Sequence, residues 1–384
     1  MRRRTVAHLV TQFNIGGTER QLVERLRRHP KAFAPVVVCN HAVGGFLEPV
    51  RALGIEPIVV PYAGLTHPTA ALAVARLAAV FKLLHVDVAH ANDFGMSVLG
   101  VAAARLSNTR IVVNRVDLGH LRPGFTALHR RVEALAARNA HLVCANAEAV
   151  RRVCIDEERC KPERVVVLRN GLDLEQFDRL AAAPGDPLPR EPGDTVITVV
   201  GNLWPVKDHR TLVEAAGLLK DRFPHLRFFC AGDGVERPYL ESRLRELGLE
   251  GRVVLLGHRT DVPSLLSRSD AFLLCSTAEG LSNAVMEAMA ARLPVVATRV
   301  GGNPELLDGG RGLLVPPRNP AALAAAVTRL LLDRDEAREM GRRGRSFVEA
   351  ELTVSRMQAA HEELYLKALG EAPETTGDAL RPAA

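Results

Sequence analysis

The chain has 384 residues, more than one domain usually holds, so two domains of about 180 residues each are expected. Hydrophobic residues make up 47% of it and aromatic residues only 4%. The apolar mass is therefore Leu, Val and Ala, as in helices packed on parallel strands. The scarcity of aromatic side chains also argues against a single-stranded nucleic acid as partner.

The net charge of +6 is unevenly distributed. Basic residues exceed acidic ones by nine in residues 1–185, whereas acidic residues exceed basic ones by three in the remainder. The basic half suggests an anionic partner, either a phosphate-bearing acceptor or a membrane surface. The alternative is that these arginines only decorate solvated helix faces.

The six cysteines show no Cys-x-x-Cys spacing, and four of them lie in apolar runs, which indicates core residues in a reducing compartment. The first apolar stretch is interrupted by His8, Thr11 and Gln12, so no signal peptide is expected. The most apolar helix candidate, 68–84, contains Arg76 and Lys82 and is not predicted to span a membrane. We expect a cytoplasmic protein, with association with the inner face of the membrane as an open alternative.

Short β-branched runs alternate with helical stretches along the whole chain, which predicts parallel sheets covered on both faces. In the first half the predicted strands are 6–11, 35–39, 57–60, 86–90, 110–114, 141–145 and 165–168. In the second half they are 196–200, 228–231, 253–256, 271–275, 294–297 and 312–315.

The pattern runs twice, so the fold class is α/β, with two doubly wound, Rossmann-like domains whose strand ends face a cleft. Between the two series, the Pro-, Ala- and Gly-rich stretch 180–194 has no periodicity and indicates a linker. The predicted organisation is a first domain over 1–180, a linker over 181–194, a second domain over 195–352, a helix over 353–370 and a frayed tail over 371–384.

Two strand-to-helix turns are candidate phosphate sites. Gly16 and Gly17 follow the first strand and precede a helix, where backbone N–H groups can approach an anion. Lys207 lies just after the strand 196–200 and is placed to meet a diphosphate. The alternatives are a plain tight turn and an ordinary surface lysine.

The segment 276–289 is the most informative stretch of the sequence. A buried strand ends near its start, and Ser282 is a suitable N-cap for the helix that follows. Glu279 then lies in the loop and Glu287 in the helix, about 80° and about 12 Å apart on ideal helix geometry. They cannot share a proton, but they can hold the two ends of an extended ligand, with helix-start N–H groups for phosphates between them.

These residues resemble the Glu-x7-Glu motif of retaining glycosyltransferases of the GT-B fold, specifically family 4, and the likeness covers nearly the whole chain. It includes other motifs, namely Gly16-Gly17-x-Glu19, Asn170-Gly171-Leu172-Asp173 with Phe177, and Gly301-Gly302-Asn303-Pro304-Glu305. Arg115 and Asp117 resemble an Arg-x-Asp-Leu-Gly sequence of exopolysaccharide-type members, and His120 follows slightly late for the family's histidine.

The resemblance implies transfer of a sugar from a nucleotide-diphosphate sugar to a glycan or lipid-linked acceptor, with retention, in cell-surface polysaccharide or glycoconjugate synthesis. It implies that Glu279 contacts the sugar and Glu287 the ribose. Lys207 and Arg115 would serve the departing diphosphate. The remaining donor-binding candidates are Gly16, Gly17, Asn202, Arg259, Gly280, Leu281, Ser282 and Asn283. It also implies that the helix 353–370 packs back on the first domain, with Met357, His361, Leu364 and Tyr365 in helical register.

Two departures from the family pattern matter for the donor site. Many relatives have an arginine where this chain has Asn202 or Trp204, so the diphosphate clamp lacks one cation. No Asp-x-Asp follows a strand, so neither a metal nor another cofactor is expected. Three rival functions stay open at this point: a nucleotide-sugar 2-epimerase of the same fold, a pyridoxal-dependent phosphorylase, and a degenerate donor-binding scaffold.

Overall fold

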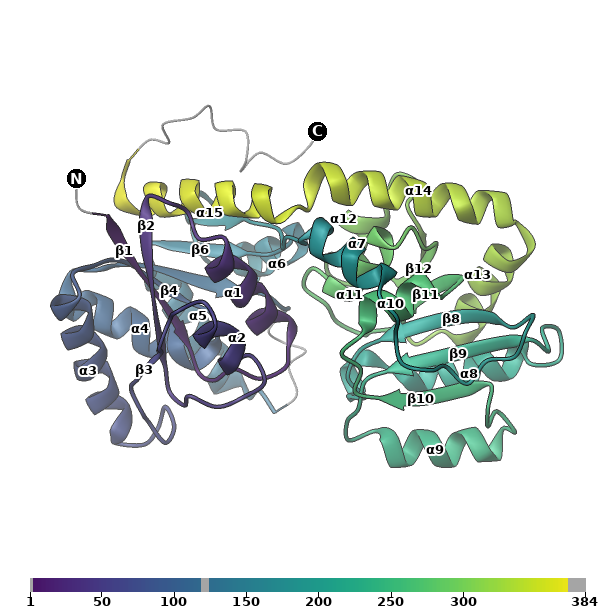
Figure 1. The fold of residues 1–384 in the computed structure, drawn as a ribbon. Helices are drawn as coiled ribbons and strands as arrows, with labels where there is room; N and C mark the ends of the chain where they lie inside the picture. The colour runs from purple at the N-terminus through teal and green to yellow at the C-terminus, as the bar shows by residue number, and fades with distance from the viewer. Residues whose placement is uncertain (1–2, 119–123, 372–384) are drawn as a thin grey trace. The chain divides into compact units, whose positions relative to one another are not determined.

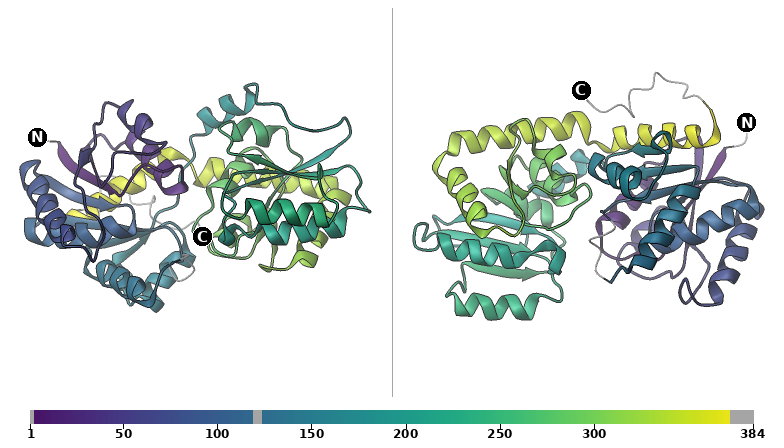
Figure 2. Two further views of the ribbon diagram at one scale, coloured as in Figure 1. Left: turned by 90° about the horizontal axis from the view of Figure 1, so that it is seen from below. Right: turned by 180° about the vertical axis from the view of Figure 1, so that it is seen from behind.

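The computed structural model describes residues 3–118 and 124–371, which belong to two compact units. The first unit comprises Met1–Gly171 and Val354–Ala384, and the second is the continuous segment Leu172–Thr353. In each unit helices cover both faces of a parallel sheet (Figures 1 and 2). The predicted α/β class is therefore confirmed.

Every strand predicted for the first half is present, with ends that differ by a residue or two. The sheet order is β3-β2-β1-β4-β5-β6-β7, and all pairs are parallel. The strands are β1 (Arg4–Val10), β2 (Phe33–Cys39), β3 (Ile58–Val59), β4 (Val86–Ala91), β5 (Arg110–Arg115), β6 (Leu142–Ala145) and β7 (Val165–Val167). The helices are α1 (Gly17–Arg27), α2 (Leu47–Arg51), α3 (Thr69–Leu83), α4 (Phe94–Ser107), α5 (Ala127–Asn139), α6 (Glu148–Arg152) and α15 (Val354–Leu369).

The second unit repeats the arrangement in the order β10-β9-β8-β11-β12-β13. Its strands are β8 (Thr195–Val200), β9 (Leu226–Ala231), β10 (Val253–Gly257), β11 (Ala271–Leu274), β12 (Val295–Thr298) and β13 (Leu313–Val315). Its helices are α7 (Leu174–Ala182), α8 (His209–Leu219), α9 (Arg237–Glu246), α10 (Val262–Ser267), α11 (Asn283–Ala290), α12 (Asn303–Leu307), α13 (Pro320–Leu332) and α14 (Arg334–Glu351).

Helix α15 returns to the first unit and completes its core. Met357, Leu364 and Tyr365 are buried in one cluster with residues of the central strands, including Val6 and Val88. In Figure 1 the helix, coloured yellow, runs along the strands of this unit. The predicted register is therefore correct, and the last helix is part of the first unit's core.

The stretch predicted as a linker is not a free connector. The first unit ends at Gly171, so α7 and the Pro-rich segment after it belong to the second unit. Ion pairs hold this segment in place: Arg259 lies 3.7 Å from Asp186, and Arg227 lies 3.3 Å from Asp194, whose side chain is almost fully buried. The composition of residues 183–194 correctly indicates a segment without regular structure. The ion pairs with Arg227 and Arg259 could not be predicted from it, because these partners lie far along the sequence.

No helix in the described ranges combines the length and the hydropathy needed to cross a membrane. All six cysteines are buried and unpaired with one another. Burial raises the pKa of the Cys230 thiol to about 12, so it remains a protonated, small core residue, as predicted.

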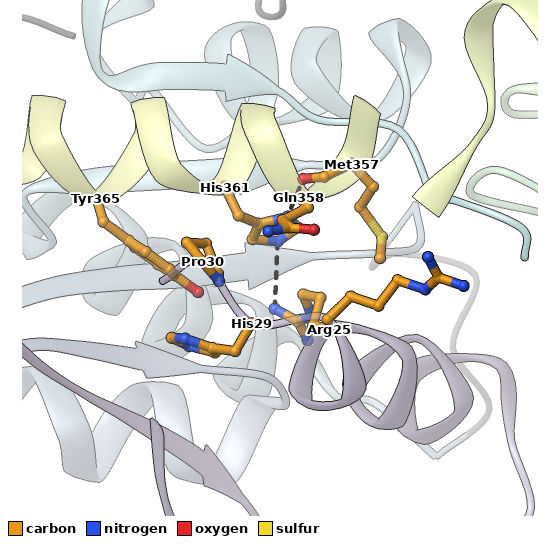
Figure 3. A pocket seen from close by; sticks show the side chains of 8 residues that line it. Arg25, His29, Pro30, Met357, Gln358, His361 and Tyr365 are labelled. Atoms are coloured by element: carbon orange, nitrogen blue, oxygen red, sulfur yellow. Dashed lines mark hydrogen bonds between the residues drawn. The ribbon is translucent and has the colours of Figure 1, made fainter. Parts of the chain in front are cut away.

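A buried polar network joins α15 to α1 and β4. Figure 3 shows its side chains from α1 and α15, among them Arg25, His361 and Tyr365. Arg25, on α1, is only 6% exposed, and its Nη1 lies 3.4 Å from His90 Nδ1 and 3.5 Å from His361 Nε2. The Tyr365 hydroxyl lies 2.9 Å from the same His90 nitrogen. The side chains of Arg25, His90, His361 and Tyr365 thus supply one another with polar partners, as is usual for buried polar groups.

Four histidines of this network are held uncharged. Burial lowers the pKa of His8, His90 and His361 well below the ordinary value, and neighbouring positive groups, including Arg25, lower it further. Burial likewise lowers the pKa of His29 to about 4. The His8 and His29 Nε2 atoms lie 3.2 Å apart, a contact in which only one ring can carry the proton.

The free energy of unfolding is expected to fall as the pH drops below about 6.5. The unfolded state takes up protons on these histidines in that window while the folded state does not, so stability is full above it. His29 alone, with its pKa near 4, contributes on the order of 2 kcal/mol between about pH 7.5 and about pH 5. Urea denaturation at several pH values measures this slope.

The substitution His361→Gln removes one of the depressed groups and should flatten the slope. The matched control is His41→Gln, because His41 is exposed and belongs to the same unit. Equal slopes for the two variants would mean that the network does not govern the acid response.

Candidate active site

The candidate site lies between β8 and β11 of the second sheet. Successive strands are added in one direction from β8 to β10 and in the opposite direction from β11 to β13. Strands β8 and β11 are hydrogen-bonded neighbours there, although β9 and β10 separate them in sequence. The loops that follow the two strands therefore leave from the same edge and diverge. Doubly wound sheets bind their ligands at this position.

The loop after β8 carries Lys207 on a short, restrained turn. Pro205–Lys207 forms a single 3-10 turn in which Lys207 N donates to Trp204 O at 2.9 Å. Asp208 follows with a φ of 48°, a left-handed conformation that ends the turn before α8 begins. The lysine is thereby presented at the start of α8, as the sequence predicted.

The loop after β11 brings Glu279 to that lysine. Lys207 Nζ donates to Glu279 Oε1 at 2.6 Å, and Ser276 Oγ donates to the same oxygen at 2.6 Å. The Glu279 side chain is 10% exposed and that of Lys207 is 26% exposed. The carboxylate is therefore fixed and charge-balanced while the ammonium group remains accessible to an anionic ligand.

Backbone contacts hold the two loops together. Thr277 N donates to Val206 O at 2.8 Å, and Cys275 Sγ lies 3.3 Å from Lys207 O. Thr298 Oγ1, at the end of β12, donates to Ser276 O at 2.6 Å. The position of the ion pair is thus set by main-chain geometry as well as by the two charges.

Gly301 supports the Glu279 loop from the third strand end. Its φ is +52°, and a Cβ at this position would lie 1.8 Å from the carbonyl oxygen of Glu279. Gly302 N donates to Gly280 O at 2.8 Å. Because only glycine fits that approach, the Gly301-Gly302 turn serves as a backbone support for the acidic loop.

Helix α11 begins as the sequence predicts. The Ser282 hydroxyl accepts a bond from Val285 N at 3.4 Å and caps the helix. Glu287 lies within the helix and is 3% exposed. Glu279 and Glu287 are therefore in a loop and a helix respectively, and the Glu279 carboxylate is bonded to Lys207 and Ser276.

The other donor-binding candidates of this unit differ in accessibility. Asn202 is exposed, Asn283 is half-buried, and Gly280, Leu281 and Ser282 are buried. The Leu281 side chain is 4% exposed and belongs to the core. Asn202 follows Gly201 at the end of β8, where its side chain can meet a ligand.

Gly16 and Gly17 lie in the first unit, at the carboxyl end of β1. Gly16 is the N-cap of α1, and a Cβ there would lie 2.7 Å from the Glu19 carboxylate. Burial raises the pKa of Glu19, and the nearby Asp93 raises it further. The loop is thus compact, and its side-chain carboxylate turns back over the glycine.

Arg115 has a different environment from the one expected. It is 3% exposed and forms ion pairs with Glu133 and Glu158, which come from α5 and from the turn after α6. Those two carboxylates keep its pKa above the ordinary value. Its charge is balanced inside the first unit, which argues against a role in neutralising a diphosphate. His120 lies outside the described residues.

Arg259 is also occupied by protein carboxylates. Its Nε donates to Asp261 Oδ1 at 2.7 Å and its Nη2 donates to Asp186 O at 3.3 Å. The hydrogen bond with Asp261 raises the pKa of this arginine. In this structure Arg259 anchors the Pro-rich segment to α10, and its side chain is 8% exposed.

Ser276, Thr298 and Gly301 support the site, a role that the sequence did not predict for them. Ser276 stands three residues before Glu279, a spacing at which the hydroxyl can bond to the carboxylate, so this contact could have been predicted from the sequence. The contact of Thr298 depends on strand order and had no local signal, whereas Gly301 belongs to a motif that the sequence showed, although its contact with the Glu279 loop could not be read from it. Within residues 3–118 and 124–371 no cluster of three or more metal-ligating side chains occurs.

Comparison with known families gives two matches on adjacent parts of the chain. The family described as "Glycosyltransferase Family 4" matches residues 15–176, and "Glycosyl transferases group 1" matches residues 194–333. Between them they account for well over half of the chain.

Several characterised proteins are similar to it. The UDP-Gal:alpha-D-GlcNAc-diphosphoundecaprenol alpha-1,3-galactosyltransferase of Escherichia coli is 32% identical over 59% of this chain. That match spans 62% of the relative, less than two thirds of its length. The D-inositol 3-phosphate glycosyltransferase of Salinispora tropica is 29% identical over 83% of this chain and 74% of its own.

Among solved structures, HepE of Anabaena in complex with UDP superposes with a TM-score of 0.81 at 23% identity, covering 94% of this chain and all of HepE. At this identity the likeness concerns the fold. It is the GT-B fold of two doubly wound units that the sequence predicted.

Replacing Gly301 by alanine is expected to displace the Glu279 loop. The added methyl group would lie against the Glu279 carbonyl, so the loss of stability should exceed the roughly 1 kcal/mol typical of a left-handed alanine. Gly248→Ala is the matched control, since Gly248 has a φ of +62° in the same unit with nothing within 4 Å. Thermal unfolding of both variants measures the difference, and equal losses would show that the close approach is not a constraint.

Proposed function

This chain belongs to the group 1 glycosyltransferases of family 4, and we propose that it transfers a sugar from a nucleotide-diphosphate sugar to a glycan or lipid-linked acceptor, with retention of configuration. The observation that carries the proposal is the Lys207–Glu279 ion pair at the reversal point of the second sheet. It combines an accessible cation for a phosphate with a fixed carboxylate for a sugar.

The chemistry follows from that arrangement. The bond between the anomeric carbon and the diphosphate breaks, the acceptor oxygen bonds to that carbon from the same face, and the acceptor proton passes to the departing phosphate. Lys207 and the N-terminus of α11 supply positive charge where the diphosphate leaves. Glu279 holds the transferred sugar, and the proposal requires no metal ion or other cofactor.

The choice of substrates rests on the relatives. HepE binds UDP and UDP-glucose, as its structures with these ligands record. The Escherichia coli enzyme carries UDP-Gal and a diphosphoundecaprenol-linked sugar in its name. These names support a nucleotide-sugar donor and a lipid-linked acceptor in cell-surface polysaccharide synthesis for this chain.

The decisive experiment measures nucleoside diphosphate released from UDP-glucose and UDP-galactose, with and without acceptor glycans, in the presence of EDTA. Acceptor-dependent release that persists in EDTA is expected, and the anomeric configuration of the product is read by NMR. Conversion of the donor sugar without any acceptor would indicate an epimerase. No release with any donor would indicate a binding scaffold, and visible absorbance of a bound pyridoxal would indicate a phosphorylase.

The two glutamates are expected to fail in different ways. Glu279→Gln should mainly lower turnover, because the carboxylate acts where charge develops as the sugar leaves. Glu287→Gln should mainly raise the donor KM, because a ribose contact is the same in ground and transition states. Loss of one charged hydrogen bond is worth roughly 1.5–3 kcal/mol, or about 10- to 150-fold.

Steady-state kinetics on folded variants separates these effects, with circular dichroism as the check on folding. The check matters for Glu287, since its side chain is almost fully buried. Wild-type turnover and wild-type donor KM in both folded variants would contradict the assignment.

We also infer a peripheral contact with an anionic membrane, through one helical layer of the first unit. Helices α3, α4 and α5 lie side by side, as their contacts indicate. Five of their leucines are 49–79% exposed: Leu72, Leu83, Leu106, Leu128 and Leu135. Their exposed basic residues are Arg76, Lys82, Arg105, Arg130, Arg131 and Arg138.

The sole carboxylate in these three helices, that of Glu133, is buried against Arg115. An apolar surface with basic charges and no exposed acidic side chain is complementary to anionic lipid headgroups. The arrangement supports the membrane alternative over arginines on ordinary solvated faces.

The protein is expected to co-sediment with vesicles containing phosphatidylserine at low salt and to detach as salt rises. The double substitution Leu128→Ser and Leu135→Ser should weaken this binding several-fold. Leu332→Ser, at a leucine that is 64% exposed in the second unit, is the control. Equal binding to neutral vesicles, or none at all, would leave the arginines as ordinary surface residues.

A further inference from the structure

Trp204 is an exposed side chain at the start of the turn that carries Lys207. The proposed reaction gives it no role. It is the only tryptophan of the chain, and 46% of it is exposed. It stands three residues before Lys207. Single exposed apolar side chains are common on protein surfaces, so the place of Trp204 on the turn that carries Lys207, rather than its exposure alone, makes it a candidate ligand contact.

The backbone around Trp204 is rigid. Trp204 N donates to Asn202 O at 2.7 Å, its carbonyl accepts from Lys207 N, and Pro205 follows it directly. The preceding Leu203 is completely buried. The ring is therefore presented on a fixed turn, and a ligand that packs against it orders little additional chain.

This turn belongs to the sugar end of the site. Thr277 bonds to Val206 between Trp204 and Glu279, so the tryptophan turn is fastened to the loop that carries the sugar-side carboxylate. The ribose-side candidate, Glu287, lies in α11 beyond that loop. A base stacked on Trp204 would have to lie at the wrong end of the donor.

The side chains of Glu279 and Trp204 differ in how far they are exposed to solvent. The Glu279 side chain, which would hold the donor sugar, is 10% exposed, whereas Trp204 is 46% exposed. Trp204 is thus the more accessible of the two side chains, which suits contact with the second sugar, the acceptor, rather than with the sugar held at Glu279.

The neighbouring loop and the helix after it carry further exposed apolar side chains. Leu203 exchanges backbone bonds with Asp233 and Glu236, and the intervening Val235 is 63% exposed. Tyr239, one turn farther on, is 44% exposed and lies under the Arg210 guanidinium at 4.0 Å. Aromatic and apolar groups beside a few fixed polar groups are the usual lining of a small-molecule site.

We propose that Trp204 is a specificity-determining residue that packs against a pyranose ring of the acceptor. This proposal rests on the glycosyl transfer proposed above. It predicts that acceptors are selected by the apolar face of their sugar as well as by any phosphate they carry.

Because Trp204 is the sole tryptophan, its fluorescence reports on this position directly. The probes are UDP and the methyl glycosides of glucose, galactose and N-acetylglucosamine. With UDP present, at least one glycoside should shift the emission to shorter wavelength and reduce quenching by acrylamide, whereas UDP alone should do neither. Equal protection by UDP alone, or protection by none of the glycosides, overturns the proposal.

Kinetics with the glycoside that binds gives an independent test. Trp204→Ala should raise the acceptor KM about tenfold, Trp204→Phe should restore most of it, and the donor KM should stay within about twofold. Leu218→Ala is the control, since Leu218 is 61% exposed near the opposite end of α8. A rise in donor KM alone, or no change with Trp204→Ala, overturns the role of Trp204. Absence of acceptor-dependent nucleotide release in the wild-type protein instead contradicts the proposed function itself.

Discussion

In a parallel sheet, the loops that follow the strands all leave from the same edge. The site of the second unit depends on this arrangement at the neighbouring strands β8 and β11. At β8 and β11 the strand order runs in opposite directions, so the following helices turn away from each other and leave the loop ends uncovered. Lys207 and Glu279 occupy those two ends and meet at 2.6 Å. Ser276, Gly301 and the main chain of Val206 then hold the pair in a single geometry.

The ion pair also explains how a partly exposed lysine can bind an anion while its side chain keeps a fixed position. Glu279 holds the ammonium group in place, and Ser276 shares the same carboxylate oxygen. An arriving diphosphate therefore meets a cation whose side-chain freedom is already restricted, and less conformational entropy is lost on binding. Lys207 and Glu279, on two adjacent loops, thus form a binding site for an anion that is already ordered before the ligand arrives.

Local pattern predicted the framework because its causes are local. The strands within residues 3–118 and 124–371 are built on short apolar runs bounded by turns, and Ser282 caps α11 through a contact three residues away. The register of Met357, Leu364 and Tyr365 follows from helix periodicity. Arg115 and Arg259 illustrate the limit: their environments are set by Glu133, Glu158 and Asp186, which lie on other segments. The Pro-rich segment was assigned as a linker for the same reason, since ion pairs rather than composition hold it on the second unit.

The return of α15 to the first unit has a consequence for synthesis on the ribosome. The second unit is a continuous segment whose two ends are joined by the bond from Leu172 N to Leu352 O at 2.8 Å, so it can complete its core as soon as Thr353 has emerged. The first unit is synthesised earlier but lacks the helix that covers Val6, Val88 and Val112. One apolar face of its sheet stays uncovered until α15 has left the exit tunnel, so this unit is made first but completes its core after the second unit. Chains truncated before α15 are therefore left with an open hydrophobic sheet, the kind of surface that chaperones bind and that aggregates.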